Sequence, residues 1–242
     1  KERFLNVFNG KMPDRVPVTL FIVEHGHFIT QVYPDVDPFD YITFQLKIIE
    51  FQKELGCDVF IRLVFGVNDP ISLHYGGLKT DAQTENWEVK TTERKSGDTT
   101  IYRSEIHTPE GVLTQDFSAY QVRPGTFMYS CTDPPIKSSR DLEIAIKYEP
   151  GMDPDYPRRM KEWLKDIKEA VGEDGIVGSW SPHGPFNNSS MLIKQDLLYR
   201  LFLSDPDYYD KLMNFAMDRV LPYAIAIEEA GENIDEDLVN KV

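Results

Sequence analysis

Apolar residues in the first quarter of the chain follow two different periods. Between residues 37 and 55 they recur at helical spacing. The apolar face of this helix comprises Phe39, Ile42, Leu46, Ile49, Phe51 and Leu55. Asp37 suits the N-cap and Pro38 the first turn. Nearly continuous apolar runs at 16–23 and 57–65 predict strands covered on both faces, so we expect a strand-helix-strand unit with a right-handed crossover.

The middle of the chain changes to alternating apolar and polar positions. This alternation extends from residue 85 to residue 121 and is divided by turn signals at 96–98 and 109–111. It predicts an antiparallel β insertion of β-hairpins over 85–121, laid on the main body of the protein.

The second half returns to helices and one strand. Helical periods are found at about 157–170, at 191–203 and from Asp205 to Gly231, and residues 175–179 form a short apolar strand. After Gly231 a further core strand is expected, but the next residues are strongly acidic. We therefore expect that the sequence omits residues near Gly231–Ile234.

Polar and aromatic residues follow the first strand. Glu24, His25 and His27 come directly after it, and the intervening glycine lets both imidazoles point the same way. Glu24 could bind a metal or act as a base, which makes these three residues candidates for catalysis. The alternative is a solvated loop whose histidines bond to the backbone.

Further candidates for substrate binding follow the other strands. His183 and Asn187 could position a substrate oxygen, although His183 could instead cap the next helix. Trp180 could face a bound molecule, although a tryptophan here is more often part of a core. Asn68 follows the strand at 57–65, although the adjoining Asp-Pro is also an ordinary turn opener.

The composition limits the class of protein. The chain has 242 residues and a net charge of −14, and such an acidic surface excludes nucleic acid and anionic membranes as favoured partners. It has no apolar run long enough to span a membrane, and we expect no signal peptide. Its two cysteines, Cys57 and Cys131, provide no disulfide framework, so we expect a cytoplasmic protein.

The order of several motifs resembles the uroporphyrinogen decarboxylase (URO-D) superfamily. The matching segments are 3–5, 9–10, 13–18, 108–113, 178–186, 204–206 and 229–231. The resemblance implies a single α/β domain over residues 1–242, a (β/α)8 TIM-type barrel with its site at the carboxyl ends of the strands. Members of the family are longer than this chain, which agrees with C-terminal strands missing from the sequence.

Three departures separate the chain from true decarboxylases of this family. The loop at 24–28 has no arginine to bind a carboxylate-rich tetrapyrrole, and Glu24 would repel one. Phe65 or a neighbour stands where the family has its catalytic aspartate, and Met191 stands near the place of its tyrosine. The chain is therefore nearer to the cobalamin-dependent methyltransferases.

The methyltransferase branch implies zinc, which activates a thiol or polarises the methyl carrier. Its His-x-Cys motif does not occur here, and neither Cys57 nor Cys131 suits a ligand, so the metal ligands are unknown.

Three hypotheses follow from the resemblance. The first is a methyltransferase that moves a methyl group between a small methylated substrate or thiol and a corrinoid on a partner protein, with a homodimer as the assembly. The second is uroporphyrinogen decarboxylase itself. The third is a non-catalytic barrel that binds a corrinoid or tetrapyrrole.

Overall fold

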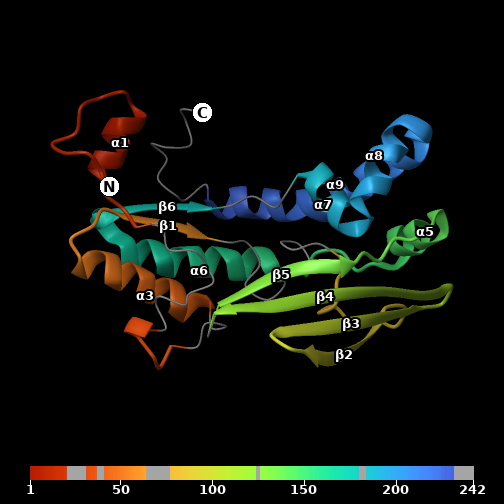
Figure 1. The fold of residues 1–242 in the computed structure, drawn as a ribbon. Helices are drawn as coiled ribbons and strands as arrows, with labels where there is room; N and C mark the ends of the chain where they lie inside the picture. The colour runs from red at the N-terminus through yellow and green to blue at the C-terminus, as the bar shows by residue number, and fades with distance from the viewer. Residues whose placement is uncertain (21–30, 37–40, 64–76, 124–125, 180–183, 232–242) are drawn as a thin grey trace. The chain divides into compact units, whose positions relative to one another are not determined.

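The structure is a computed structural model that describes residues 1–20, 31–36, 41–63, 77–123, 126–179 and 184–231 (Figure 1). The chain divides into two compact units, each described by itself. Unit 1 comprises Lys1–Val67, Pro154–Ser181 and Ile225–Val242; unit 2 comprises Asn68–Asp153 and Pro182–Ala224.

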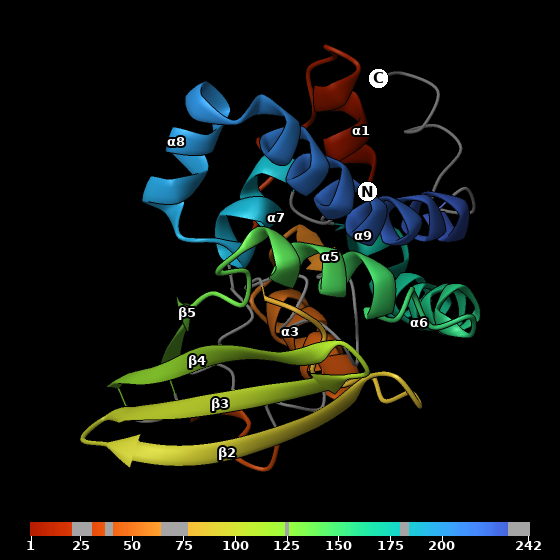
Figure 2. The ribbon, with the colours of Figure 1, turned by 90° about the vertical axis from the view of Figure 1, so that its right-hand side faces the viewer.

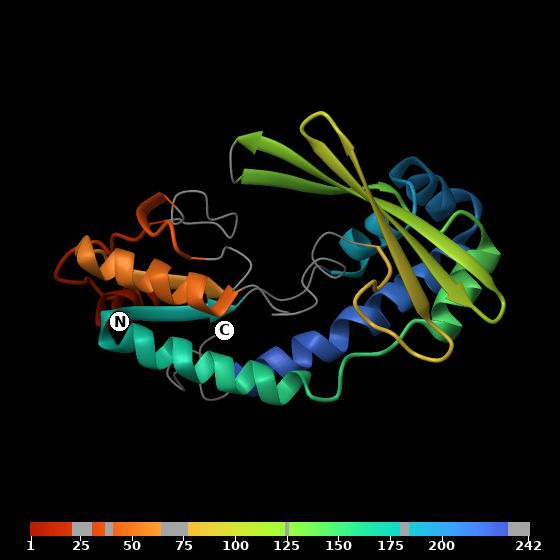
Figure 3. The same cartoon turned by 90° about the horizontal axis from the view of Figure 1, so that it is seen from below.

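Unit 1 is built on a parallel pair of strands. β1 (Val59–Leu63) pairs with β6 (Gly175–Ser179), which the short helix η1 (Gly172–Asp174) precedes. Helix α3 (Tyr41–Glu54) contacts β1, α6 (Tyr156–Val171) contacts β6, and Figure 3 shows these two helices side by side. Helix α1 (Glu2–Phe8) contacts β6 and lies on the other side of the strands in Figure 1.

Helix α6 shows why the apolar period was informative. Pro157 stands in its first turn, where the missing N–H costs nothing. Its buried side chains recur at three- and four-residue spacing, as an amphipathic helix requires. They are Tyr156, Met160, Trp163, Leu164, Ile167 and Val171. The helix predicted at 157–170 is confirmed.

Helix α3 is confirmed, but its predicted apolar face is partly wrong. Its buried residues are Phe44, Gln45, Ile48, Ile49 and Gln52. Leu55, predicted on the buried face, is 57% exposed. Two glutamines belong to the buried face, and one of them, Gln52, accepts a hydrogen bond of 2.8 Å from the Thr19 hydroxyl through its Oε1. The predicted N-cap Asp37 lies outside the described residues.

Unit 2 contains an antiparallel sheet in the order β2-β3-β4-β5 (Figure 2). Its strands are β2 (Glu88–Ser96), β3 (Thr99–Thr108), β4 (Gly111–Arg123) and β5 (Thr126–Asp133). The antiparallel strands predicted between 85 and 121 are confirmed, and the sheet continues to Asp133. Its role as an insertion into a larger domain stays a prediction.

The helices of unit 2 complete its hydrophobic core. They are α5 (Ser139–Tyr148), α7 (Pro185–Leu192), α8 (Gln195–Ser204) and most of α9 (Pro206–Gly231). Ser138 caps α5 by accepting a hydrogen bond from the Asp141 N–H. Trp87, Ile106 and Leu113 of the sheet region pack into one cluster with Leu142, Leu198 and Leu212 of these helices.

The predicted (β/α)8 barrel is wrong. Within the described ranges, the strands form one parallel pair and one separate antiparallel sheet of four, and they do not close into a barrel. Among the described strands, parallel pairing joins only β1 and β6, so these strands do not repeat the strand-helix-strand pattern around a ring.

The first predicted strand is also wrong over residues 16–20, which have no strand structure. Val16 is 76% exposed and Val18 is 55% exposed. Pro17 has no N–H to donate, and Val18 bonds to Asp58 through both its N–H and its carbonyl. These bonds replace strand pairing. Residues 21–23 lie outside the described residues.

Other expectations concern parts of the chain that are not described. The residues expected to be missing near Gly231–Ile234 adjoin positions 232–242, which lie outside the described ranges. None of the helices in the described ranges has the length and apolar character needed to cross a membrane.

Candidate functional site

The parallel pair of unit 1 brings two chain segments to one edge. Val59 is the register partner of Gly175, and Leu63 is the partner of Ser179 at the carboxyl ends. A Cβ placed on Gly175 would lie 1.8 Å from the Val59 carbonyl oxygen, so only glycine permits this approach. Ligands of parallel sheets bind beyond such carboxyl ends, and the sequence continues there into the segments with predicted site residues.

Six of the seven predicted site residues lie outside the described residues. They are Glu24, His25, His27, Asn68, Trp180 and His183. The seventh, Asn187, is exposed in the first turn of α7, where its backbone carbonyl accepts a hydrogen bond of 2.7 Å from the Ser190 hydroxyl. The roles of all seven residues therefore stay predictions.

The neighbouring residue, Asn188, is the one that faces the interior of unit 2. It is fully buried, and its Oδ1 accepts a hydrogen bond of 2.6 Å from Arg219 Nη1. A single residue step along a helix turns a side chain by about 100°. This rotation explains why Asn187 meets solvent and Asn188 meets α9.

Arg219 is the centre of a buried polar cluster in unit 2. Its Nε donates to Glu149 Oε2 at 2.6 Å and its Nη2 donates to Glu149 Oε1 at 3.0 Å. Both side chains are more than nine-tenths buried. Nη2 also donates to the Gly77 carbonyl at 2.5 Å. Such a bidentate, hydrogen-bonded pair is the arrangement in which a buried charge is tolerated.

The segment Gly77–Lys79 is held by the same cluster. The Lys79 N–H donates to Glu149 Oε1 at 2.8 Å. The side chain of Gln115 bonds to both the N–H and the carbonyl of Leu78, at 2.7 and 3.0 Å. Gly77 has a φ of +101°, and a Cβ there would lie 2.7 Å from Gln115 Oε1, so this turn requires glycine.

The Lys79 side chain adds two further hydrogen bonds to this polar cluster. Its buried Nζ donates to the Gly151 carbonyl at 2.7 Å and to the Tyr223 hydroxyl at 2.9 Å.

Sequence reasoning missed this cluster, although one signal was present. Phe215, Arg219 and Tyr223 recur at four-residue spacing on α9, so a cation stands in an apolar stripe. A charge at such a position needs a buried partner. The sequence alone does not say that the partner is Glu149, seventy residues earlier in the chain.

The cluster joins distant parts of the chain through hydrogen bonds. The Arg219 guanidinium bonds to a carboxylate, an amide oxygen and a backbone carbonyl in three different segments. The Asn188 Nδ2 has no hydrogen-bond partner within the described ranges. These bonds hold three chain segments at one guanidinium, so the cluster fixes the positions of those segments.

A second polar cluster lies in unit 1. Buried Asp58 accepts hydrogen bonds from Arg3 at 2.7 Å, Arg15 at 2.6 Å and the Val18 N–H at 2.9 Å. Burial by itself raises the pKa of Asp58. The hydrogen bonds from Val18 and Arg3 and the charge of Arg15 outweigh it, so the pKa is below its usual value.

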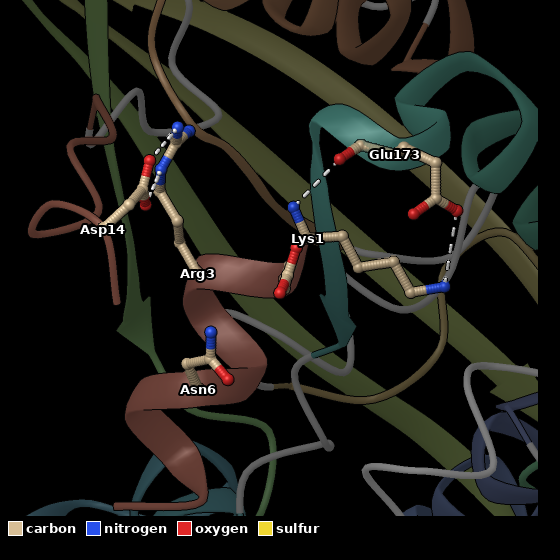
Figure 4. A pocket seen from close by; sticks show the side chains of 6 residues that line it. Lys1, Arg3, Asn6, Asp14 and Glu173 are labelled. Carbon is tan, nitrogen blue, oxygen red and sulfur yellow. Dashed lines mark hydrogen bonds and ion pairs between the residues drawn. The ribbon is translucent and has the colours of Figure 1, made fainter. Parts of the chain in front are cut away.

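Arg3 also lines an open pocket of about 380 Å³ (Figure 4). The other lining residues are Lys1, Glu2, Asn6, Asp14 and Glu173. Arg3 bonds twice to Asp14, at 2.6 and 2.7 Å, and these hydrogen bonds lower the pKa of Asp14 to about 2. Because cations and carboxylates pair within the lining, the pocket presents no set of like charges to a ligand.

The described residues do not form a metal site. No group of three or more His, Cys, Asp or Glu side chains in the described ranges is arranged to hold a metal ion. Zinc therefore has no supporting ligand set among them, and Glu24, His25 and His27 lie outside them.

Comparison with known proteins gives one similar structure. A methyltransferase from Methanosarcina mazei has a similar fold, with a TM-score of 0.51 and 20% sequence identity. The similarity covers 96% of this chain and 56% of that protein, so this chain spans little more than half of its length. No protein family and no curated protein matches the chain. The comparison shows the fold, and membership of the URO-D superfamily stays a prediction.

Proposed function

We propose that the protein is a methyltransferase, and that it moves a methyl group between a small methylated compound or thiol and a corrinoid carried by a partner protein. The observation that carries the proposal is the fold shared with a methyltransferase over 96% of the chain. The sequence adds the motif order described above and the absence of arginine at 24–28.

The parallel pair supports a location for the reaction. β1 and β6 end together at Leu63 and Ser179, and the predicted residues Asn68, Trp180 and His183 follow these ends in sequence. Active sites of α/β proteins lie beyond the carboxyl ends of parallel strands. Glu24, His25 and His27 supply the acid–base groups of the proposal.

The reaction requires one proton. A corrinoid on the partner protein would supply the acceptor for the methyl group, and the oxygen or nitrogen atom that loses the methyl group would take up the proton. His25, His27 or Glu24 could donate this proton as a general acid. If the methyl group instead moves from the corrinoid to a thiol, the same residues could accept the thiol proton.

The test is methyl transfer from a panel of methoxylated aromatic compounds and methylamines to added cob(I)alamin. We expect the Co(I) spectrum to convert to that of methylcob(III)alamin with at least one donor. His25→Ala should lower the rate by about 10²-fold or more. His107→Ala is the matched control, because His107 lies on β3 and is not a candidate residue.

Conversion of uroporphyrinogen to coproporphyrinogen by the same preparation would support the decarboxylase hypothesis instead. Metal analysis of the purified protein tests the zinc prediction separately, with about one zinc per chain as the supporting result.

A further inference from the structure

The buried guanidinium of Arg219 binds two places that follow, in the sequence, segments with predicted site residues. Gly77, whose carbonyl it binds at 2.5 Å, directly follows residues 64–76, which contain Asn68. Asn188, whose side chain it binds at 2.6 Å, lies shortly after residues 180–183, which contain Trp180 and His183.

We propose that Arg219 is a positioning residue that fixes Gly77 and α7 to one guanidinium within unit 2. This inference rests on the proposed function, because the predicted substrate-binding residues Asn68 and His183 precede Gly77 and α7 in the sequence. All the residues in the network that Arg219 holds belong to unit 2.

The shape of the guanidinium group explains why arginine, and not lysine, can bind all three acceptors. Its nitrogens lie in one rigid plane, and three of them are used here for acceptors on three segments. Glu149 holds two of these nitrogens and also accepts a hydrogen bond from the Lys79 N–H, so it ties the guanidinium to Gly77–Lys79 a second time. A lysine could keep the charge, but a single ammonium could not span the same three acceptors.

The Asn188 amide has a defined orientation because of this bond. Arg219 Nη1 is a donor only, so it must face the Asn188 oxygen and leaves Nδ2 without a partner among the described residues. Aspartate at this position would keep the acceptor oxygen, whereas leucine would keep the size and lose it. The two substitutions therefore separate the hydrogen bond from packing.

Amide hydrogen exchange of the whole protein tests the bridging role. The reporters are the Lys79 amide, which bonds to Glu149, and the peptide that covers α7. We expect Arg219→Lys to speed exchange about tenfold at both reporters, and Asn188→Leu to speed it in α7 alone. Asn188→Asp should stay within about threefold of the wild-type protein.

Arg200→Lys is the matched control, because Arg200 bonds to Asp196 on the exposed face of α8. It should leave both reporters unchanged. If Arg219→Lys does not fold, Asn188→Leu still tests the contact with α7, where exchange should become faster while the Lys79 amide stays unchanged. Faster exchange of Arg219→Lys at one reporter only or at neither, or unchanged exchange of α7 in Asn188→Leu, would overturn the bridge.

A kinetic measurement tests whether the bridge serves the reaction. In the methyl-transfer assay, we expect Arg219→Lys to lower kcat about tenfold or more and to change KM less than about threefold, because misplaced groups affect the reacting geometry most. An unchanged kcat with faster exchange would leave a purely structural brace and overturn the positioning role. A wild-type protein without methyl transfer would contradict the proposed function, while hydrogen exchange would still decide the bridge.

Discussion

Asp58 shows how one buried carboxylate organises the start of the chain. It receives two guanidinium groups and the Val18 N–H, and its own N–H donates to the Val18 carbonyl at 2.7 Å. A carboxylate with several donors has a lowered pKa and contributes stability in its ionised form. The segment at 16–20 is therefore held by a side chain and not by a sheet.

Asp58→Asn should lower the free energy of unfolding by about 1–3 kcal/mol at pH 7, because charge-assisted hydrogen bonds are lost. The folded-state pKa of Asp58 lies below its unfolded value, so its contribution is present above about pH 4 and lost as pH falls through the folded pKa. Thermal unfolding of both proteins between pH 7 and pH 2.5 measures this.

The difference between the two proteins in Tm should shrink below about pH 4. Asp14, with a pKa of about 2, titrates in both proteins and does not affect the comparison directly. A difference that stays constant down to pH 2.5 would mean that the charge of Asp58 does not stabilise the fold.

Cys131 should be unreactive in the native protein. Burial, followed by the negative charges of Asp133 and Asp116, raises the pKa of its thiol to about 12. At pH 8, roughly one thiol in 10⁴ is then ionised, and the thiolate is the reactive form. Mass spectrometry after brief alkylation at pH 8 should find Cys131 unmodified before unfolding and modified after it. Rapid native alkylation would contradict the burial described here.

At the scale of elements, the contact between β1 and β6 depends on one glycine. Gly175→Ala should destabilise the protein by more than about 2 kcal/mol, because its Cβ would meet the Val59 carbonyl at 1.8 Å. Gly178→Ala is the matched comparison in the same strand, since its Cβ would lie 3.1 Å from the Phe60 ring and 3.9 Å from the Ile61 carbonyl oxygen, without a backbone clash. Chemical denaturation of both variants measures the difference. Equal stability of the two would contradict the described register.

Elements with a strong local signal were predictable from the sequence. Helix α6 combines a proline in its first turn with an apolar period, and both signals are local. Helix α3 was found as well, but Gln45 and Gln52 replace apolar residues on its buried face, so the apolar period gave that face only in part. Residues 16–20 have a strand-like composition, and long-range bonds to Asp58 overrode it.

The candidate site was less predictable, because its contacts join distant segments. The sequence pointed to the start of α7 and chose Asn187, whereas the buried bond to Arg219 belongs to Asn188. The helical period of α7 could have distinguished Asn188 from Asn187 only if the face of α7 that packs toward α9 had been known. The pairing of Arg219 with Glu149 and Gly77 has no local signal at all.

At the scale of the molecule, the predicted barrel failed for a similar reason. Strand-helix-strand order is local, but the closure of a ring depends on pairing among many strands, and the described strands show one parallel pair. The fold nevertheless agrees with that of a methyltransferase at 20% identity, because packing tolerates extensive replacement of apolar side chains.

Methyl transfer can be followed in the spectrum of cob(I)alamin mixed with the purified protein and the donor panel. For a methyltransferase, we expect conversion to methylcob(III)alamin that depends on His25 and does not depend on His107. A Co(I) spectrum that stays unchanged with every donor, with the corrinoid protein present and the protein folded, would rule out methyl transfer.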